Sequence, residues 1–273
     1  MQFQVGDIVG RKSYDCDVHF RIIRLNHQKK EAILKGIDMR LLADAPIDDL
    51  VLISSSMRSS VLEREEQHTS SSVKEIKLKR EQEEESFFRL PGRVLHMDGD
   101  PNYLKKCLAL YKELDIPAYG IHVPEKDMPK RVIPLLERVK PDILVITGHD
   151  AYSKSKGARN DLAAYRHSAY FKEAVLKARQ YEKNRDNLII FAGACQSYFE
   201  ILIQAGANFA SSPGRVNIHA LDPVYIVEKA CYTPINRIIN LQEVVEHSVT
   251  GSSGLGGVDT RGNHRLGKPY LKE

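Results

Sequence analysis

The chain lacks the sequence features that usually indicate binding to nucleic acid or to a membrane. Its 273 residues include no tryptophan and only four cysteines, and 40 basic against 36 acidic residues leave a net charge of only +4. So small a charge does not predict nucleic-acid binding. No run approaches the roughly 18 apolar residues that span a bilayer, and residues 1–10 lack the basic and apolar regions of a signal peptide. We therefore expect a cytoplasmic protein that binds neither nucleic acid nor a membrane.

The four cysteines lack a pairing pattern. The widely spaced Cys16, Cys107, Cys195 and Cys231 form no CxxC motif and no Cys/His ligand pattern, which argues against a structural zinc site. A disulfide framework is not expected of a cytoplasmic chain of this size. We predict no metal and no cofactor, and the default interpretation of each cysteine is a small buried apolar residue.

Three zones of different composition predict two domains and a linker. Residues 1–54 contain short β-branched runs separated by turn residues, which predicts a small β-barrel of the SH3-like type. Residues 55–87 hold serine clusters and a charged run, typical of a solvated linker that is partly helical or disordered. Residues 88–273 alternate buried-type strands with helical patterns. This alternation predicts an α/β domain with a parallel sheet and helices on both faces.

A histidine and a cysteine follow two of the strongest predicted strands. His149 comes after DILVIT and Gly148, and Cys195 comes after NLIIFA, Gly193 and Ala194. Because ligands bind beyond the carboxyl ends of parallel strands, both side chains are expected at one rim of the sheet. A helix beginning at Gln196 would lower the pKa of the thiol. We predict Cys195 as nucleophile and His149 as general acid and base.

The order of these two residues along the chain narrows the type of cysteine peptidase. His149 precedes Cys195 by 195 − 149 = 46 residues, which is the caspase-type order, whereas papain-type enzymes place the cysteine first. Taken alone, His149 is equally well explained as a histidine in a turn, and Cys195 as a cysteine buried in the core. The flanking Gly148, Asp150 and Ala194 are candidates for supporting the site and its oxyanion donors. Asp150 could also orient His149 or simply cap a turn.

Several long stretches resemble one known family. They are MQFQVGDIVGRKSY at the start, GRVLHMDGD at 92–100, PDILVITGHDAYSK at 141–154, AYRHS at 164–168, FAGACQS at 191–197 and GANFASSPGRVNIHALDPVYIVEKA at 206–230. These are similar to the YabG family of sporulation peptidases. The resemblance implies a cysteine peptidase with a caspase- or flavodoxin-like αβα domain, and its catalytic pair falls on His149 and Cys195.

The same resemblance implies the biological setting. Family members process spore coat and other spore proteins, which points to protein substrates in the mother cell and possible association with the forming coat. It also implies cleavage chiefly after arginine. One departure from the wider caspase-like pattern is that Asp150, rather than glycine, follows the histidine, while Gly148 precedes it.

An arginine-binding pocket requires a carboxylate partner. Asp98 and Asp100 follow the first strand of the α/β zone and are our preferred candidates, with Asp222 and Asp161 as alternatives. Each is equally typical of a turn or a helix cap. Three further histidines, taken as structural or pocket-lining, are His96, His167 and His219.

Two other functions remain open from the residues. The α/β zone could be a flavodoxin-like binding domain of a non-catalytic coat scaffold. A glutaminase-like amidase would need a histidine downstream of Cys195, and His219, His247 and His264 lie there without a supporting motif; the order of His149 and Cys195 disfavours it. A catalytic Cys195 should react with thiol reagents far faster than the other cysteines.

Arginines in the linker raise the possibility of self-cleavage. If the chain cuts after arginine, Arg58, Arg64 and Arg80 are the candidate positions.

Overall fold

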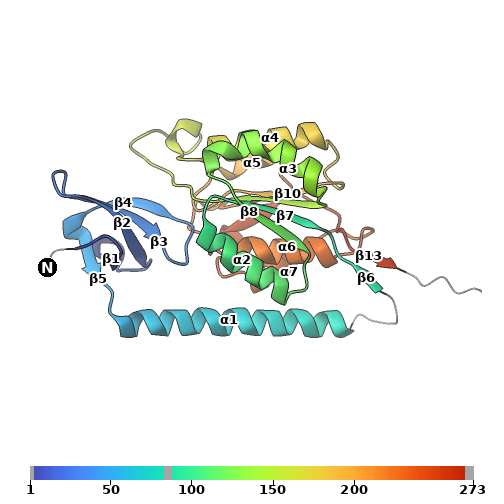
Figure 1. The fold of residues 1–273 in the computed structure, drawn as a ribbon, viewed down its shortest axis with the longest axis horizontal. Coiled ribbons are helices and arrows are strands. Elements are labelled where there is room, and N and C mark those ends of the chain that lie inside the picture. The colour runs from blue at the N-terminus through green and yellow to red at the C-terminus, as the bar shows by residue number, and fades with distance from the viewer. Residues whose placement is uncertain (1–2, 83–87, 268–273) are drawn as a thin grey trace, which may run out of the picture.

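Two sheets lie side by side along a long helix in the computed structural model, which describes residues 3–82 and 88–267 (Figure 1). The N-terminal sheet is antiparallel and has the order β4-β3-β2-β1-β5. Its strands are β1 (Ile8–Arg11), β2 (Phe20–Asn26), β3 (Glu31–Gly36), β4 (Leu42–Pro46) and β5 (Leu50–Leu52). Alternate residues of β3, such as Ala32 and Leu34, are buried, as expected of a strand with one face on a core. These strands fall within residues 1–54, where the sequence predicts strands.

The central sheet has six strands in the order β12-β11-β10-β9-β7-β8. They are β7 (Val94–Asp98), β8 (Ala118–His122), β9 (Ile143–Thr147), β10 (Ile189–Ala192), β11 (Phe209–Ser211) and β12 (Leu255–Gly257). The first five strands are parallel, and β12 pairs antiparallel with β11. A mixed α/β architecture with a mostly parallel sheet is therefore confirmed.

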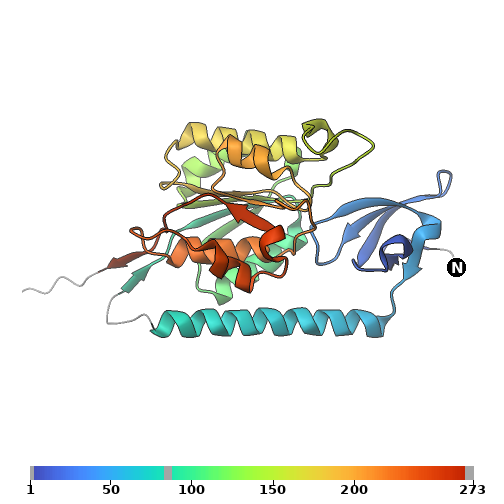
Figure 2. The same cartoon turned by 180° about the vertical axis from the view of Figure 1, so that it is seen from behind.

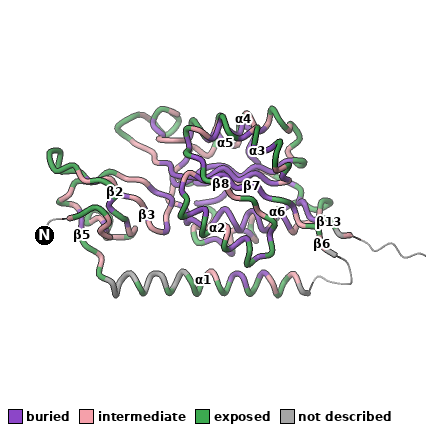
Figure 3. Tube along the Cα trace, in the orientation of Figure 1, coloured by how far each residue is buried: buried purple, intermediate pink, exposed green. Residues whose placement is uncertain are grey.

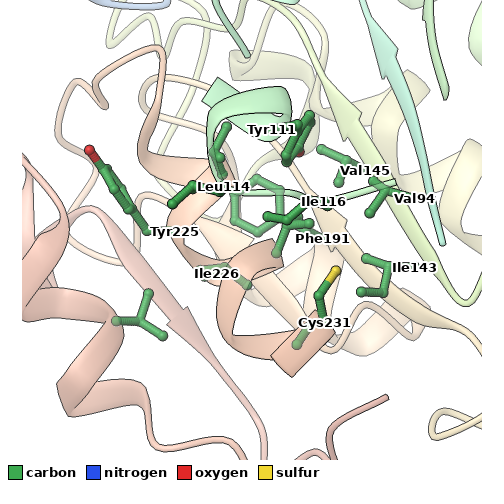
Figure 4. Close-up of a cluster of buried hydrophobic side chains, with 14 of the residues drawn as sticks. Val94, Tyr111, Leu114, Ile116, Ile143, Val145, Phe191, Tyr225, Ile226 and Cys231 are labelled. Atoms are coloured by element: carbon green, nitrogen blue, oxygen red, sulfur yellow. The ribbon is translucent and has the colours of Figure 1, made fainter. Parts of the chain in front are cut away.

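Helices cover both faces of the central sheet (Figures 1 and 2). One face carries α3 (Met128–Val139), α4 (Ser168–Tyr181) and α5 (Phe199–Ala205), and the other carries α2 (Pro101–Glu113), α6 (Asp222–Tyr232) and α7 (Leu241–His247). Every residue of β7, β9 and β10 is buried, which explains their nearly continuous apolar sequences (Figure 3). Cys231 lies in the core between the sheet and α6, close to Ile143 (Figure 4), and its thiol donates to the carbonyl oxygen of Gly92.

Residues expected to form a linker include a long helix. Helix α1 (Ser55–Gln82) has 28 residues, and its Val73 and Ile76 are buried against the α/β core. Arg80 forms an ion pair of 3.0 Å with Glu228. Self-cleavage after Arg80 would therefore require that this anchored end of the helix open first. Arg58 and Arg64 lie within the same helical backbone, outside the described side chains.

Two short strands close the arrangement beyond the helix. Strand β6 (Phe88–Leu90) pairs antiparallel with β13 (Arg265–Gly267) and brings the two ends of the α/β unit together. Among the helices of residues 3–82 and 88–267, none combines the length and apolar character that crossing a membrane requires.

Candidate active site

The carboxyl ends of three adjacent strands bring the predicted residues to one rim. Strand β9 lies between β10 and β7, so His149 follows the middle strand, Cys195 follows one neighbour, and Asp98 ends the other. Parallel strands place their carboxyl ends at the same edge, which is where ligands bind in such sheets. The two residues and Asp98 therefore lie at one edge of the sheet.

His149 is held between two carboxylates. Its Nε2 lies 3.1 Å from Oδ2 of Asp100, and its Nδ1 lies 3.2 Å from Oε1 of Glu125. The same Glu125 oxygen accepts the backbone N–H of His149 at 2.8 Å. Burial by itself would lower the pKa of His149, but the two carboxylates outweigh it and raise that pKa. Nδ1 is thus fixed by Glu125 while Nε2 faces the charge of Asp100, and the imidazolium form is favoured.

Glu125 was not found by reasoning from the sequence. It lies in a short 3-10 turn before α3 and reaches the rim between Gly99 and Gly148. A Cβ at either glycine would collide with the Glu125 carboxylate, so both positions require a residue without a side chain. A pair of glycines directly after two neighbouring strands is the signal that could have indicated a side chain entering there.

Cys195 is fully buried in a turn. Its Sγ accepts the backbone N–H of Ile218 at 3.2 Å and lies 3.5 Å from the carbonyl oxygen of the same residue. Burial raises the pKa of the thiol to about 12. The prediction that a helix begins at Gln196 was wrong: Gln196 has φ of 54°, and α5 begins only at Phe199. The expected lowering of the thiol pKa by a helix N-terminus is therefore absent, and rapid alkylation of Cys195 is not expected in this conformation.

The two predicted catalytic side chains do not bond to one another. Across the described residues, no hydrogen bond or ion pair joins His149 to Cys195. The ring of Tyr103 lies 5.5 Å from that of His149, and its hydroxyl lies 2.5 and 2.7 Å from the carbonyl oxygens of Gly36 and Met39. The rim is thus in direct contact with the segment that joins β3 to β4.

Asp98 binds a guanidinium. Nη1 of Arg40, from the N-terminal unit, lies 2.7 Å from Oδ2 of Asp98, and both side chains are completely buried. The same arginine donates to the carbonyl oxygen of Ala220 at 2.9 Å and to Sγ of Cys107 at 3.3 Å. Despite the opposing effect of burial, Arg40 and His96 hold the pKa of Asp98 well below its usual range. The rim therefore contains a pocket already fitted to an arginine side chain.

The same pocket offers a set of metal-ligand atoms. Atoms of His96, Asp98 and Cys107 lie within 4.8 Å of one another and are buried. The Arg40 guanidinium contacts both Asp98 and Cys107, so it provides the positive charge among them.

Asp100 lies beside the arginine pocket but serves other partners. Its Oδ1 accepts the backbone N–H of Asn102 at 2.8 Å and so caps α2. Its Oδ2 forms ion pairs with Lys35 and His149, which lower its pKa well below the usual value although burial opposes them. The structure therefore assigns Asp100 to His149, whereas the guanidinium goes to Asp98.

Asp150 does not contact the His149 ring. Its carboxylate accepts the hydroxyls of Ser168 at 2.5 Å and Ser197 at 2.9 Å, and the backbone N–H of His167 at 2.8 Å. Ser197 in turn accepts the N–H of Ala194 at 2.9 Å. Asp150 thus ties the end of β9 to the start of α4 and to the turn that carries Cys195.

The remaining aspartates lie outside the pocket. Asp222 accepts the backbone N–H of Val249 at 2.9 Å and bonds to Thr250 and His219, which fixes the turn before α6. Asp161 accepts the N–H of Ala163 at 2.9 Å and caps a 3-10 turn. Neither carboxylate contacts the guanidinium of Arg40.

Replacing Glu125 with glutamine should lower the pKa of His149. The change removes one of the two negative charges that raise it. A histidine whose pKa is raised by folding stabilises the protein below the unfolded pKa of about 6.5, and this stabilisation is lost as pH rises through the folded pKa. Glu125→Gln should weaken that dependence. An NMR titration of the imidazole, with denaturation at several pH values, measures both effects.

The matched control for this substitution is Glu137→Gln on the exposed side of α3. It should leave the His149 titration unchanged. An unchanged titration in Glu125→Gln itself would contradict the assigned role of Glu125.

Comparison with known proteins agrees with the resemblance in the sequence. The family model described as YabG peptidase U57 matches residues 4–269. The chain is 51% identical over 287 residues to a Bacillus subtilis (strain 168) protein described as a sporulation-specific protease YabG, and the match covers 99% of each chain. No solved structure matches the chain.

Proposed function

The chain belongs to the YabG peptidase U57 family and is a protease with a role in sporulation, and on that premise we propose that it is a cysteine endopeptidase that cuts after arginine. One observation supports this most directly. A buried carboxylate, Asp98, binds a guanidinium at the same sheet edge at which His149 and Cys195 lie. Arginine suits such a pocket because its planar guanidinium is always charged and is less strongly hydrated than an ammonium.

Cys195 is the proposed nucleophile. His149 takes the thiol proton, and the sulfur attacks the carbonyl carbon of the substrate arginine. Collapse of the tetrahedral intermediate breaks the peptide bond after that arginine and leaves an acyl-enzyme that water hydrolyses. His149 protonates the leaving amine and then deprotonates the water. Glu125 and Asp100 favour the imidazolium that this protonation requires.

Backbone amides next to these residues are the proposed oxyanion donors. The N–H groups of His149 and Ala194 already donate to Glu125 and Ser197. We assign the role to the amides of Asp150 and Cys195, with Gly148 leaving space for Glu125 behind them. The thiol and imidazole must approach one another in the catalytic conformation.

We also propose a fold family for each of the two units of the chain. We assign the α/β unit to the caspase-like arrangement, because His149 and Cys195 follow neighbouring parallel strands in that order. We assign the N-terminal sheet to the SH3-like barrels, supported by its short antiparallel strands. The proposed substrates are spore coat and other spore proteins in the mother cell, supported by the sporulation role in the description of the Bacillus subtilis relative.

A non-catalytic coat scaffold is the second function considered from the sequence. Membership of a peptidase family removes most of its support, and a buried carboxylate beside a histidine held by two further carboxylates is not required of a scaffold.

Cleavage of peptides that differ in the residue before the scissile bond tests the proposal. Wild-type protein should cut after arginine, whereas Cys195→Ala and His149→Ala should lose about 10⁴-fold or more in rate. Cys231→Ser is the matched control, because that thiol is buried on the far side of the sheet from α3–α5 and donates to the carbonyl oxygen of Gly92, away from the proposed catalytic residues. Equal cleavage by all four proteins would reject the assignment.

A further inference from the structure

The segment between β3 and β4 binds the rim as an added strand. Residues 38–40 pair with residues 218–220: the N–H of Arg40 donates to the carbonyl oxygen of Ile218 at 3.2 Å, and the N–H of Ala220 donates to that of Asp38 at 2.9 Å. Met39 and His219 form an antiparallel bridge, and Leu41 and Asp150 form a parallel one. Extended peptides commonly bind proteins in this way, with main-chain bonds giving affinity and side-chain pockets giving specificity.

The side chain of Arg40 occupies the pocket of the rim. Its guanidinium bonds to Asp98, to the carbonyl oxygen of Ala220 and to Cys107, and it is completely buried. A buried ion pair is a poor source of stability, because the desolvation of both charges offsets their attraction. Such a pair is more readily explained as recognition of an arginine than as a means of holding two units together.

The same segment encloses the catalytic groups. Leu41 belongs to a buried apolar cluster that includes Val9, Phe20, Ile218 and Cys195. Lys35, at the end of β3, forms an ion pair with Asp100, which also contacts His149. Cys195 is consequently fully buried, and a substrate cannot reach its sulfur in this conformation.

An open cleft lies next to the segment formed by residues 38–41. A cleft of about 310 Å³ lies between the two units next to Gln196, and Leu41, Ala43 and Tyr152 are among its lining residues. The strand-like segment therefore leads from the closed pocket around Arg40 to an open cleft lined by Leu41 and by Gln196, the residue after Cys195. A bound substrate would take the same course.

We propose that residues 38–41 are a built-in inhibitor that occupies the substrate position, with Arg40 in the pocket that receives the arginine of a substrate. This inference rests on the proposed function and adds its regulation. The N-terminal unit must release Arg40 from Asp98 before a protein substrate can bind, so the chain as described is latent. Asp38, paired with Lys106 at 2.7 Å, gives the segment a second anchor.

Two substitutions that loosen the segment test this proposal in the full chain. Arg40→Gln removes the guanidinium and should raise both alkylation of Cys195 by iodoacetamide and cleavage of an arginine peptide by about tenfold or more. Asp38→Asn weakens the second anchor without leaving a buried charge, and it should raise both rates by about two- to fivefold. Arg24→Gln, at an exposed position of β2, is the control and should change neither rate.

Measuring both alkylation and cleavage distinguishes the proposal of an inhibitory segment from the proposal of a cysteine peptidase. Peptide mapping identifies alkylation at Cys195, and buried Cys231 in the same samples, which lies away from Arg40, reports any general unfolding. Faster alkylation without cleavage would support the inhibitor and reject the peptidase mechanism. Cleavage by wild type at the same rate as by both variants, with unchanged alkylation, would overturn the inhibitor while leaving the peptidase.

Discussion

Asp98→Asn should lower the preference for arginine over citrulline before the scissile bond by about 100-fold. Citrulline has nearly the shape of arginine but no charge, so the comparison isolates the charge pairing with Asp98. The quantity to measure is the ratio of kcat/KM for the two peptides. This ratio does not depend on how much of the enzyme is open, because both peptides compete for the same open fraction.

The same substitution should also destabilise the protein by about 3–5 kcal/mol, since Arg40 is left buried without its counter-ion. Adding Arg40→Met should recover most of this loss. Asp44→Asn, which breaks the exposed pair with Arg166, is the control and should cost about 1 kcal/mol or less. Urea denaturation of these three variants and wild type measures these changes in stability. If both the preference for arginine over citrulline and the stability were unchanged, the assignment of Asp98 to the arginine pocket would be rejected.

Asp150→Ala should destabilise the protein by about 3–5 kcal/mol. Four donors would lose their common acceptor: the hydroxyls of Ser168 and Ser197 and the backbone N–H groups of Ala151 and His167. Asp150→Asn keeps an acceptor of the same shape and should cost less than half as much. Thermal or urea denaturation gives the comparison.

Kinetics then distinguish support from catalysis at Asp150. Because its carboxylate does not contact the His149 ring, Asp150→Asn should leave the pH profile of kcat/KM in place, whereas Glu125→Gln should shift the limb that reports His149. A shift of that limb in Asp150→Asn would mean that Asp150 orients the histidine after all.

Reasoning from the sequence succeeded where local patterns determine the outcome. Continuous apolar runs identified β9 and β10, and the residues that follow them lie at one rim because parallel strands share their carboxyl edge. Asp98 lies at this edge for the same reason, and its role as the partner of a substrate arginine stays a prediction. These inferences need only the strand period and the direction of the chain.

Other features depend on contacts between distant segments. Nothing local to Cys195 indicates that a loop more than 150 residues earlier buries it, or that Arg40 fills the pocket beside it. Glu125 was missed because its contact with His149 depends on glycines in two other loops. The sparse apolar positions of residues 55–87 predict a linker that is partly helical, but they do not indicate that Val73 and Ile76 of α1 are buried against the α/β core.

Helix α1 keeps residues 38–41 close to the rim whenever the two units separate. Its 28 residues span about 42 Å at 1.5 Å per residue, and its C-terminal half is fixed to the α/β unit through Val73, Ile76 and Arg80. When residues 38–41 leave the rim, they stay on this short tether, at an effective concentration in the range of about millimolar. A protein substrate must therefore outcompete a neighbour that never diffuses away, and weakly binding sequences would be excluded by this competition alone.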